Sequence, residues 1–165
     1  MEYRELHDWV DYHYWARDRL LDAVAALTPE QFTRDMGNSF RSVRDTLTHI
    51  YFAEWAWRLR WLGESPTPLS PEMFPDLATL RKTWVEHEAK MRGLLEELGN
   101  EGIQRVFEYK LMSGPRGASP FWQMLQHVVN HASYHRGQVT TLLRQLGAAP
   151  PKSMDLIAFY RERGA

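Results

Sequence analysis

The chain has 165 residues, of which 44% are hydrophobic, with no cysteine and a formal net charge of -1. This length predicts one domain over residues 1–165 with a substantial core. The lack of cysteine excludes disulfides, thiolate metal ligands and a cysteine nucleophile. The 20 basic and 21 acidic residues are well mixed, so we expect no nucleic-acid partner and no binding to anionic membranes.

The N-terminal segment mixes acidic, basic and apolar residues and does not resemble a signal peptide. The longest stretch free of Asp, Glu, Lys and Arg covers residues 117–135. It contains Pro120 and three histidines, which a hydrocarbon environment would not tolerate. We therefore expect a soluble, cytoplasmic protein that has no membrane partner.

Apolar residues recur at helical spacing in four long segments, of which two lie in the N-terminal half. The first covers residues 3–27 and ends before proline at Thr28-Pro29. The second begins at Ser42, whose spacing to Asp45 has the form of a capping box. It is expected to stop at Gly63, a suitable left-handed residue beyond the helix end. Four prolines in residues 64–75 predict a loop.

The third helix is predicted over residues 76–98. Partial alternation over residues 103–112, followed by a Gly-Pro-Arg-Gly turn, indicates a short two-stranded flap. Ser119-Pro120 predicts the start of the fourth helix, with the serine as its cap and the proline as its first residue. This helix should end at Leu146, and a short fifth helix should follow over residues 153–163.

These segments predict an all-α fold, a four-helix bundle with a short extra C-terminal helix. Three of the connections are long for a helical bundle. A crossover topology and a simple up-and-down topology therefore both remain open.

Three histidines of the fourth helix, His127, His131 and His135, are spaced by four residues and so lie on one face. Met124 and Leu142 share this face, which makes it the inward one. Histidines one turn apart can offer two nitrogens to a single divalent metal, and zinc, nickel or iron would accept them.

A third ligand must come from another helix, and His49 is the best candidate. Its side of the second helix carries the small residues Ala53 and Ala56, which leave room for a site. His127 is interpreted as a core or rim histidine, and His13 as a hydrogen-bonded core histidine.

Two further histidines, His7 and His87, lie among charged residues and are predicted on the surface. Arg136 points away from the histidine face and is expected to pair with an acid or with a partner subunit. The tryptophans that recur in the second and third helices are expected in the core or in a subunit interface: Trp55, Trp57, Trp61 and Trp84.

These motifs resemble those of a known family. Residues 126–138, QHVVNHASYHRGQ, resemble the fourth-helix motif H-x3-H-R-G-Q of the DinB/YfiT-like superfamily of metalloenzymes. Residues 45–50, DTLTHI, followed by Ala53-Glu54, are similar to its second-helix signature. Residues 12–16 and 155–160 also fit, so the resemblance spans nearly the whole chain.

The resemblance implies a four-helix bundle in which three histidines bind a divalent metal, usually zinc or nickel. By motif position these ligands are His49, His131 and His135. It also implies a homodimer and a small-molecule substrate. Relatives include thiol S-transferases that use bacillithiol or mycothiol, a mycothiol-dependent maleylpyruvate isomerase, and presumed hydrolases.

Three nitrogen ligands leave a fourth position for water or for an external low-molecular-weight thiol. The first option leads to hydrolysis and the second to thiol transfer. The alternative is a non-catalytic, metal-stabilised bundle or stress-related binding protein, in which His127 or His13 supplies a fourth ligand.

Residues that assist catalysis are harder to assign. Ala132 stands where zinc proteases of the H-E-x-x-H type carry a glutamate, which argues against a peptidase. Asp45 or Glu54 could act as a base, although Asp45 could equally be only the acid at the helix start. Gln138 could hydrogen-bond a ligand or water, or else the second nitrogen of a histidine.

Overall fold

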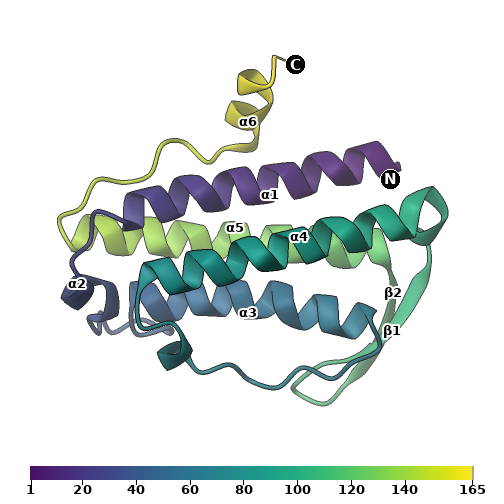
Figure 1. Ribbon diagram of the computed structural model, residues 1–165, viewed down its shortest axis with the longest axis horizontal. Coiled ribbons are helices and arrows are strands. Elements are labelled where there is room, and N and C mark those ends of the chain that lie inside the picture. The colour runs from purple at the N-terminus through teal and green to yellow at the C-terminus, as the bar shows by residue number, and fades with distance from the viewer. Residues whose placement is uncertain (165) are drawn as a thin grey trace.

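The computed structural model describes residues 1–164, and its four long helices lie side by side as a bundle (Figure 1). These helices are α1 (Tyr3–Val24), α3 (Val43–Trp61), α4 (Leu77–Gly102) and α5 (Phe121–Gln145). The shorter elements are α2 (Pro29–Thr33), the 3-10 turn η1 (Pro71–Met73), the strands β1 (Val106–Lys110) and β2 (Arg116–Pro120), and α6 (Leu156–Glu162). The predicted all-α bundle with a short C-terminal helix is confirmed.

The bundle has a crossover topology. Helices α3 and α4 run in the same direction, and the segment 62–76 returns along the bundle to connect them (Figure 1). Helix α5 runs antiparallel to α3, so Trp61 near the end of α3 packs on Phe121 at the start of α5, with ring centroids 4.6 Å apart. Helix α1 packs against α4 and α5. The metal-ligand candidates on α3 and α5 therefore sit on neighbouring helices.

Most predicted helix ends hold. The Ser42 hydroxyl accepts a hydrogen bond from the backbone N–H of Asp45 at 3.1 Å and so caps α3. Asp76 caps α4 by accepting from the N–H of Thr79 at 2.7 Å. Gly63 follows α3 with a φ of 79°, the left-handed conformation expected there.

Two helix ends differ from expectation. Helix α1 ends at Val24 rather than near residue 27, and the short helix α2 follows, which the sequence analysis did not predict. Its signal is a capping box in which Thr28 and Gln31 bond each other's backbone N–H groups. Helix α4 extends to Gly102, because the helix resumes after Gly99 interrupts it with a φ of 55°.

The start of α5 is also different. Ser119 and Pro120 belong to β2, and Phe121 is the first helical residue, so the predicted serine cap is wrong. The N–H groups of Phe121 and Trp122 donate to the carbonyls of Arg105 at 3.0 Å and Ile103 at 3.2 Å. Backbone ahead of the predicted flap thus satisfies donors that a side-chain cap would otherwise take. The flap itself is confirmed as the β1–β2 hairpin.

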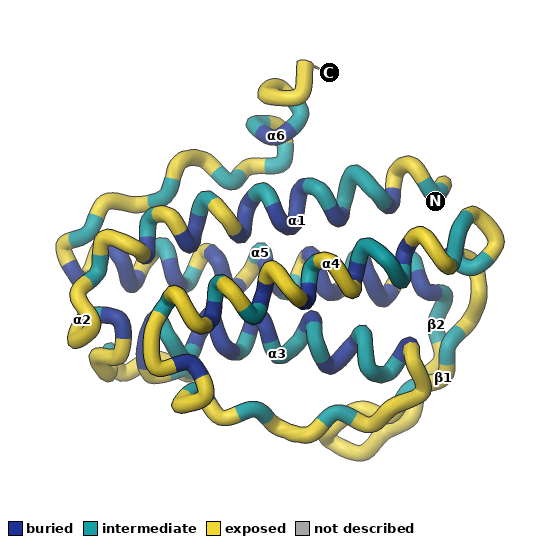
Figure 2. The backbone as a smooth tube through the Cα atoms, viewed as in Figure 1, coloured by how far each residue is buried: buried dark blue, intermediate teal, exposed yellow. Residues whose placement is uncertain are grey.

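Buried residues line the sides of the four long helices that face each other (Figure 2). Each long helix contributes a leucine with no exposed surface: Leu6, Leu47, Leu80 and Leu142. Helix α6 packs outside the bundle, where Phe159 joins a small cluster with Tyr12, Ala16 and Val129. No helix within residues 1–164 is long and apolar enough to cross a membrane.

Candidate metal centre

The three predicted ligands meet between α3 and α5. The Nε2 atom of His131 lies 3.1 Å from Nε2 of His49 and 3.1 Å from Nε2 of His135. Potential ligand atoms of all three residues lie within 4.8 Å of one another. His131 and His135 are one turn apart on α5, as their spacing predicted, and His49 faces them from α3.

Gln138 fixes the orientation of one of these rings. Its Oε1 atom lies 2.7 Å from Nδ1 of His135, so Nδ1–H donates to the amide oxygen. A neutral imidazole carries one N–H, and Nε2 of His135 therefore presents its lone pair to the other two histidines. This is the tautomer that a metal ligand requires.

The environment keeps His49 and His131 neutral. Burial, with a smaller effect of the neighbouring His135, lowers the pKa of His49 to about 4. Burial and the neighbouring histidines lower the pKa of His131 to about 3. At neutral pH both rings are therefore lone-pair donors rather than cations.

This donor set fits a divalent metal ion. Zinc–nitrogen bonds of about 2.0–2.1 Å in a tetrahedral site place two ligand nitrogens roughly 3.3 Å apart. The two separations of 3.1 Å are close to that value. Three imidazole nitrogens at this spacing could therefore hold one divalent ion between them.

Phe40 covers one side of the site, a contact that the sequence analysis missed. Its ring stacks on His49 with centroids 3.9 Å apart and planes at 20°, and its edge meets His135 at 5.5 Å. Phe40 lies in the segment between α2 and α3, where no periodic pattern marks an inward position. The stacked ring restricts the rotation of His49.

The two alternative ligands stand apart from this group. His127 is exposed, and its ring centroid is 5.9 Å from that of His131. His13 is buried and its Nε2 lies 3.0 Å from Glu54, as expected of a core histidine. Within residues 1–164, the only three-residue group with metal-ligand spacing is His49, His131 and His135.

The two predicted catalytic residues are held by other contacts. Asp45 accepts a hydrogen bond from Nε of Arg44 at 3.0 Å, at the first turn of α3. Gln138 contacts His135, which is the structural alternative considered for it. A catalytic role for either residue stays a prediction.

Glu54, which was considered as a base, is enclosed in the core between the four long helices. It has no exposed surface, and it accepts hydrogen bonds from Trp84 Nε1 at 2.7 Å, from His13 Nε2 at 3.0 Å and from the Tyr14 hydroxyl. Burial by itself raises the pKa of a carboxyl group, but the contacts with His13 and other donors outweigh it and lower the pKa of Glu54 to about 2. It is a buried carboxylate that accepts three hydrogen bonds.

One residue next to Glu54 was placed wrongly from the sequence. His87 was expected on the surface but is 3% exposed, with Nε2 3.5 Å from the Glu54 carboxylate. Its neighbours Glu86 and Lys90 are exposed, and this local charge concealed an inward position on α4.

Arg136 is 2% exposed and has no acidic partner among residues 1–164 within ion-pair distance. It points away from the metal-ligand candidates, as predicted, but donates to Nδ1 of His13 at 3.4 Å and to Ser133 Oγ at 2.7 Å. Burial lowers the pKa of His13, so a neutral His13 accepts from Arg136 and donates to Glu54. This hydrogen-bonded chain links a buried cation on α5 to a buried anion on α3.

The chain is similar to a known family and to a curated protein. The sequence model described as "DinB family" matches residues 3–162, a range that includes all three histidines. The curated protein "Protein DinB" of Bacillus subtilis (strain 168) is 24% identical over 163 residues, which cover 90% of this chain and 91% of that protein.

Proposed function

Because the chain belongs to the DinB family, we propose that it is a metal-dependent enzyme that transfers a small external thiol to an electrophilic small molecule. The observation that carries the proposal is the convergence of three Nε2 atoms at His49, His131 and His135. In the reaction the thiol loses its proton to solvent water and its sulfur attacks an electrophilic carbon. A carbon–sulfur bond forms as the bond to the leaving group breaks, and the leaving group departs with the bonding electrons.

The three histidines would hold a zinc or nickel ion, since neutral imidazole suits both metals. Such an ion, when bound, favours the thiolate over the thiol and so supplies a nucleophile at neutral pH. Gln138 keeps His135 in the ligand tautomer, and Phe40 holds the ring of His49 in place. The chain has no cysteine, so the thiol must come from outside.

The open ligand set supports an enzyme over a purely structural metal site. Structural zinc sites have four protein ligands, whereas catalytic sites have three and leave one position for a substrate. His13 is hydrogen-bonded to Glu54, and His127 lies outside the ligand group. A non-catalytic, metal-stabilised bundle would need a fourth ligand from one of these residues.

Hydrolysis of a small molecule is the second candidate, because the same open position accepts water. It is helped by a carboxylate base beside the ion. Within residues 1–164 no carboxylate joins the three-histidine group, since Asp45 pairs with Arg44 and Glu54 is enclosed. A thiol, with a pKa near 8.5 in water, needs less help to ionise, which favours thiol transfer.

The proposal can be tested on protein loaded with cobalt(II), a coloured substitute for zinc. Adding 2-mercaptoethanol should produce a sulfur-to-cobalt charge-transfer band, and the protein should accelerate the reaction of this thiol with monochlorobimane. His131→Ala should abolish both signals, while His127→Ala should retain them. Cobalt binding with neither band nor acceleration would overturn thiol transfer, and turnover of p-nitrophenyl acetate without thiol would support hydrolysis instead.

A further inference from the structure

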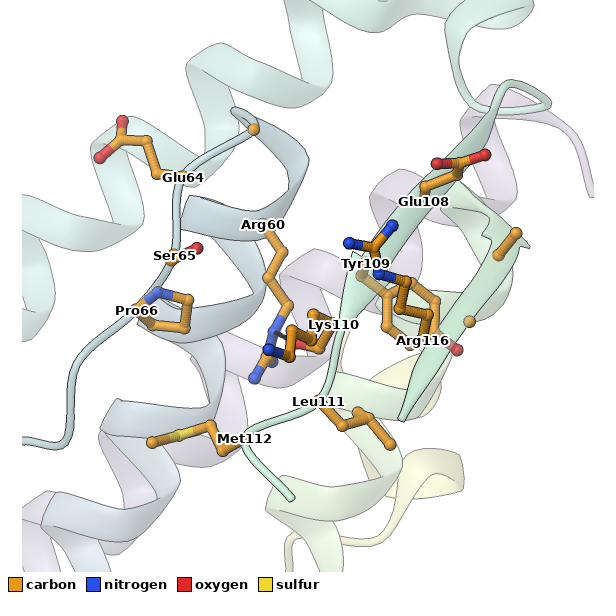
Figure 3. A pocket seen from close by; sticks show the side chains of 13 residues that line it. Arg60, Glu64, Ser65, Pro66, Glu108, Tyr109, Lys110, Leu111, Met112 and Arg116 are labelled. Carbon is orange, nitrogen blue, oxygen red and sulfur yellow. Dashed lines mark hydrogen bonds between the residues drawn. The ribbon is translucent and has the colours of Figure 1, made fainter. Parts of the chain in front are cut away.

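A cavity of about 800 Å³ lies between the C-terminal end of α3 and the β1–β2 hairpin (Figure 3). Three cationic side chains line it: Arg60 from α3, Lys110 from β1 and Arg116 from β2. Lys110 and Arg116 are directly opposite each other in the antiparallel pairing. The folding of the hairpin onto α3 therefore gathers three positive charges from separate elements.

These cations lack acidic partners in the described part of the chain. No carboxylate there forms an ion pair with any of the three. Glu64 and Glu108 also line the cavity, but the carboxylate of Glu64 points away from Arg60 (Figure 3). Like charges gathered without partners repel one another, and a bound anion would relieve that repulsion.

Arg60 is held in place in a way that leaves hydrogen-bond donors free. Its Nε donates to the carbonyl of Lys110 at 3.2 Å, and its guanidinium lies over the ring of Trp57 at 4.9 Å from the centroid. The side chain is half-buried, which lowers the pKa of Arg60, yet its two terminal nitrogens make no hydrogen bond within residues 1–164. A fixed guanidinium with two free nitrogens matches the paired oxygens of a carboxylate or phosphate.

The inner wall of the cavity is equally well defined. Tyr109 packs edge-to-face on Trp57, with centroids 4.9 Å apart. Its ring passes over Gly117 so closely that a Cβ atom there would lie 2.7 Å from the tyrosine Cζ. Gly117 thus permits the position of Tyr109, and the wall depends on this strand pairing.

The cavity and the three histidines lie along the same face of α3. Arg60 follows His49 by eleven residues, which returns it to within about 20° of the same direction. Ala53 and Ala56 lie between them on that face. The Arg60 guanidinium reaches back over Trp57, so its distance from His49 along the helix axis is about 12 Å.

Helix α5 supplies a second link between the two places. The ring of His127 lies 5.5 Å from that of Trp57 and 5.9 Å from that of His131. His127 is exposed, so a ligand that spans the two places would pass over it.

We propose that the cavity binds the carboxylate or phosphate group of an elongated substrate whose other end reaches His49, His131 and His135. The anionic group contacts Arg60, Lys110 and Arg116, and the chain of the substrate extends toward the histidines. The second half of this inference, the position of the reactive end, rests on the proposed function. The anion site itself rests on the cavity and its unpaired cations.

The test uses cobalt-loaded protein and two probes of equal length, 8-mercaptooctanoate and 8-mercapto-1-octanol. The charge-transfer band reports thiol binding in both cases. We expect the carboxylate probe to bind about tenfold more tightly than the alcohol, since hydrogen bonds between charged groups are the stronger ones. Arg116→Gln and Arg60→Gln should each reduce this preference to roughly twofold, and Arg60→Lys should retain part of it.

Arg105→Gln is the matched control, because Arg105 lies just before β1 and packs on Phe107 outside the cavity lining. It removes one positive charge next to the hairpin and should leave the preference unchanged. Equal binding of the two probes to the wild type would overturn the anion site while leaving thiol binding established. An equal loss of the preference for the carboxylate probe in Arg105→Gln and Arg116→Gln would also overturn the anion site, since net charge alone would then explain the effect.

A second measurement tests the anion site independently, in case the proposed function fails. If cobalt binds and neither thiol produces a band, octanoate, octyl phosphate and 1-octanol are titrated while the indole N–H resonance of Trp57 is followed by NMR. A shift with octanoate, octyl phosphate or both, absent with the alcohol and lost in Arg116→Gln, supports the anion site and tells carboxylate from phosphate. No shift with either anion overturns it.

Discussion

His135 and Arg136 are consecutive residues of α5, yet their side chains belong to two separate polar clusters. His135 joins His49 and His131 through Nε2, whereas Arg136 donates to His13 in the core cluster around Glu54. Helix α5 thus carries His131 and His135 on one side and contributes Arg136 to a buried polar cluster on another side. Substitutions in the two clusters should therefore separate metal binding from stability.

Removal of one ligand should release the metal. We expect untagged wild-type protein, purified without chelator, to contain near one divalent ion per chain, and His131→Ala to contain almost none. Two remaining nitrogens hold an ion far more weakly than three. Metal content per chain, measured by mass spectrometry, checks this.

His127→Ala is the matched control for that experiment, because it removes a histidine of the same helix outside the ligand group. It should keep the wild-type metal content. Loss of metal from both variants would mean that His127 is a ligand, and no metal in the wild type after reconstitution with zinc and nickel would contradict the site.

Gln138→Ala should weaken metal binding without abolishing it. The amide oxygen holds the ligand tautomer of His135, and loss of such a partner typically costs 10–100-fold in metal affinity. Gln138→Glu retains an acceptor at this position and should bind zinc close to wild-type strength. Competition with a coloured chelator measures both affinities, and an unchanged affinity in Gln138→Ala would argue against this role.

Glu54→Gln should destabilise the fold by about 3 kcal/mol, because an amide NH₂ would then face donors that now serve a carboxylate. The free energy of unfolding in urea measures the effect. Metal content should remain at the wild-type level, since Glu54 does not contact the ligand group. Glu30→Gln, at an exposed position of α2, should change stability by less than about 0.5 kcal/mol.

Acid should weaken the fold partly through His87. Burial lowers its pKa to about 4, against about 6.5 in the unfolded chain, although the nearby Glu54 carboxylate opposes the shift. Between these values the unfolded chain takes up a proton that the folded protein does not, so stability falls as the pH drops from 6.5 toward 4.

Titration of His87 accounts for about 3 kcal/mol of the fall in the free energy of unfolding across that pH range. His87→Met should therefore lose less stability than the wild type between pH 6.5 and 4, when both are unfolded with urea at a series of pH values. Parallel curves for the two proteins would show that His87 has the same pKa in the folded and unfolded states, which would contradict the prediction.

The sequence was sufficient to predict a feature wherever the interaction that determines it is local. Apolar periodicity located the four long helices, and Ser42 and Asp76 marked two of their starts. The spacing of His131 and His135 identified one side of the metal-ligand group. The small residues beside His49 suggested the other side, because small side chains leave room for a site.

Prediction from the sequence failed where the residue that makes the deciding contact is distant in the chain. The donors of Phe121 and Trp122 bond carbonyls ahead of the hairpin, so the serine cap was not needed. His87 and Arg136 are flanked by polar residues, and only the packing of other helices shows that they are buried. A catalytic role for Asp45 and the homodimer stay predictions.

During synthesis His49 leaves the ribosome long before its partners, since 82 residues separate it from His131. The three nitrogens meet only after α5 has been made and has docked against α3. An ion that needs all three ligands would therefore not guide the formation of α1 and α3, and apolar contacts would bring the helices together first. A metal ion held by all three histidines could bind only after this docking.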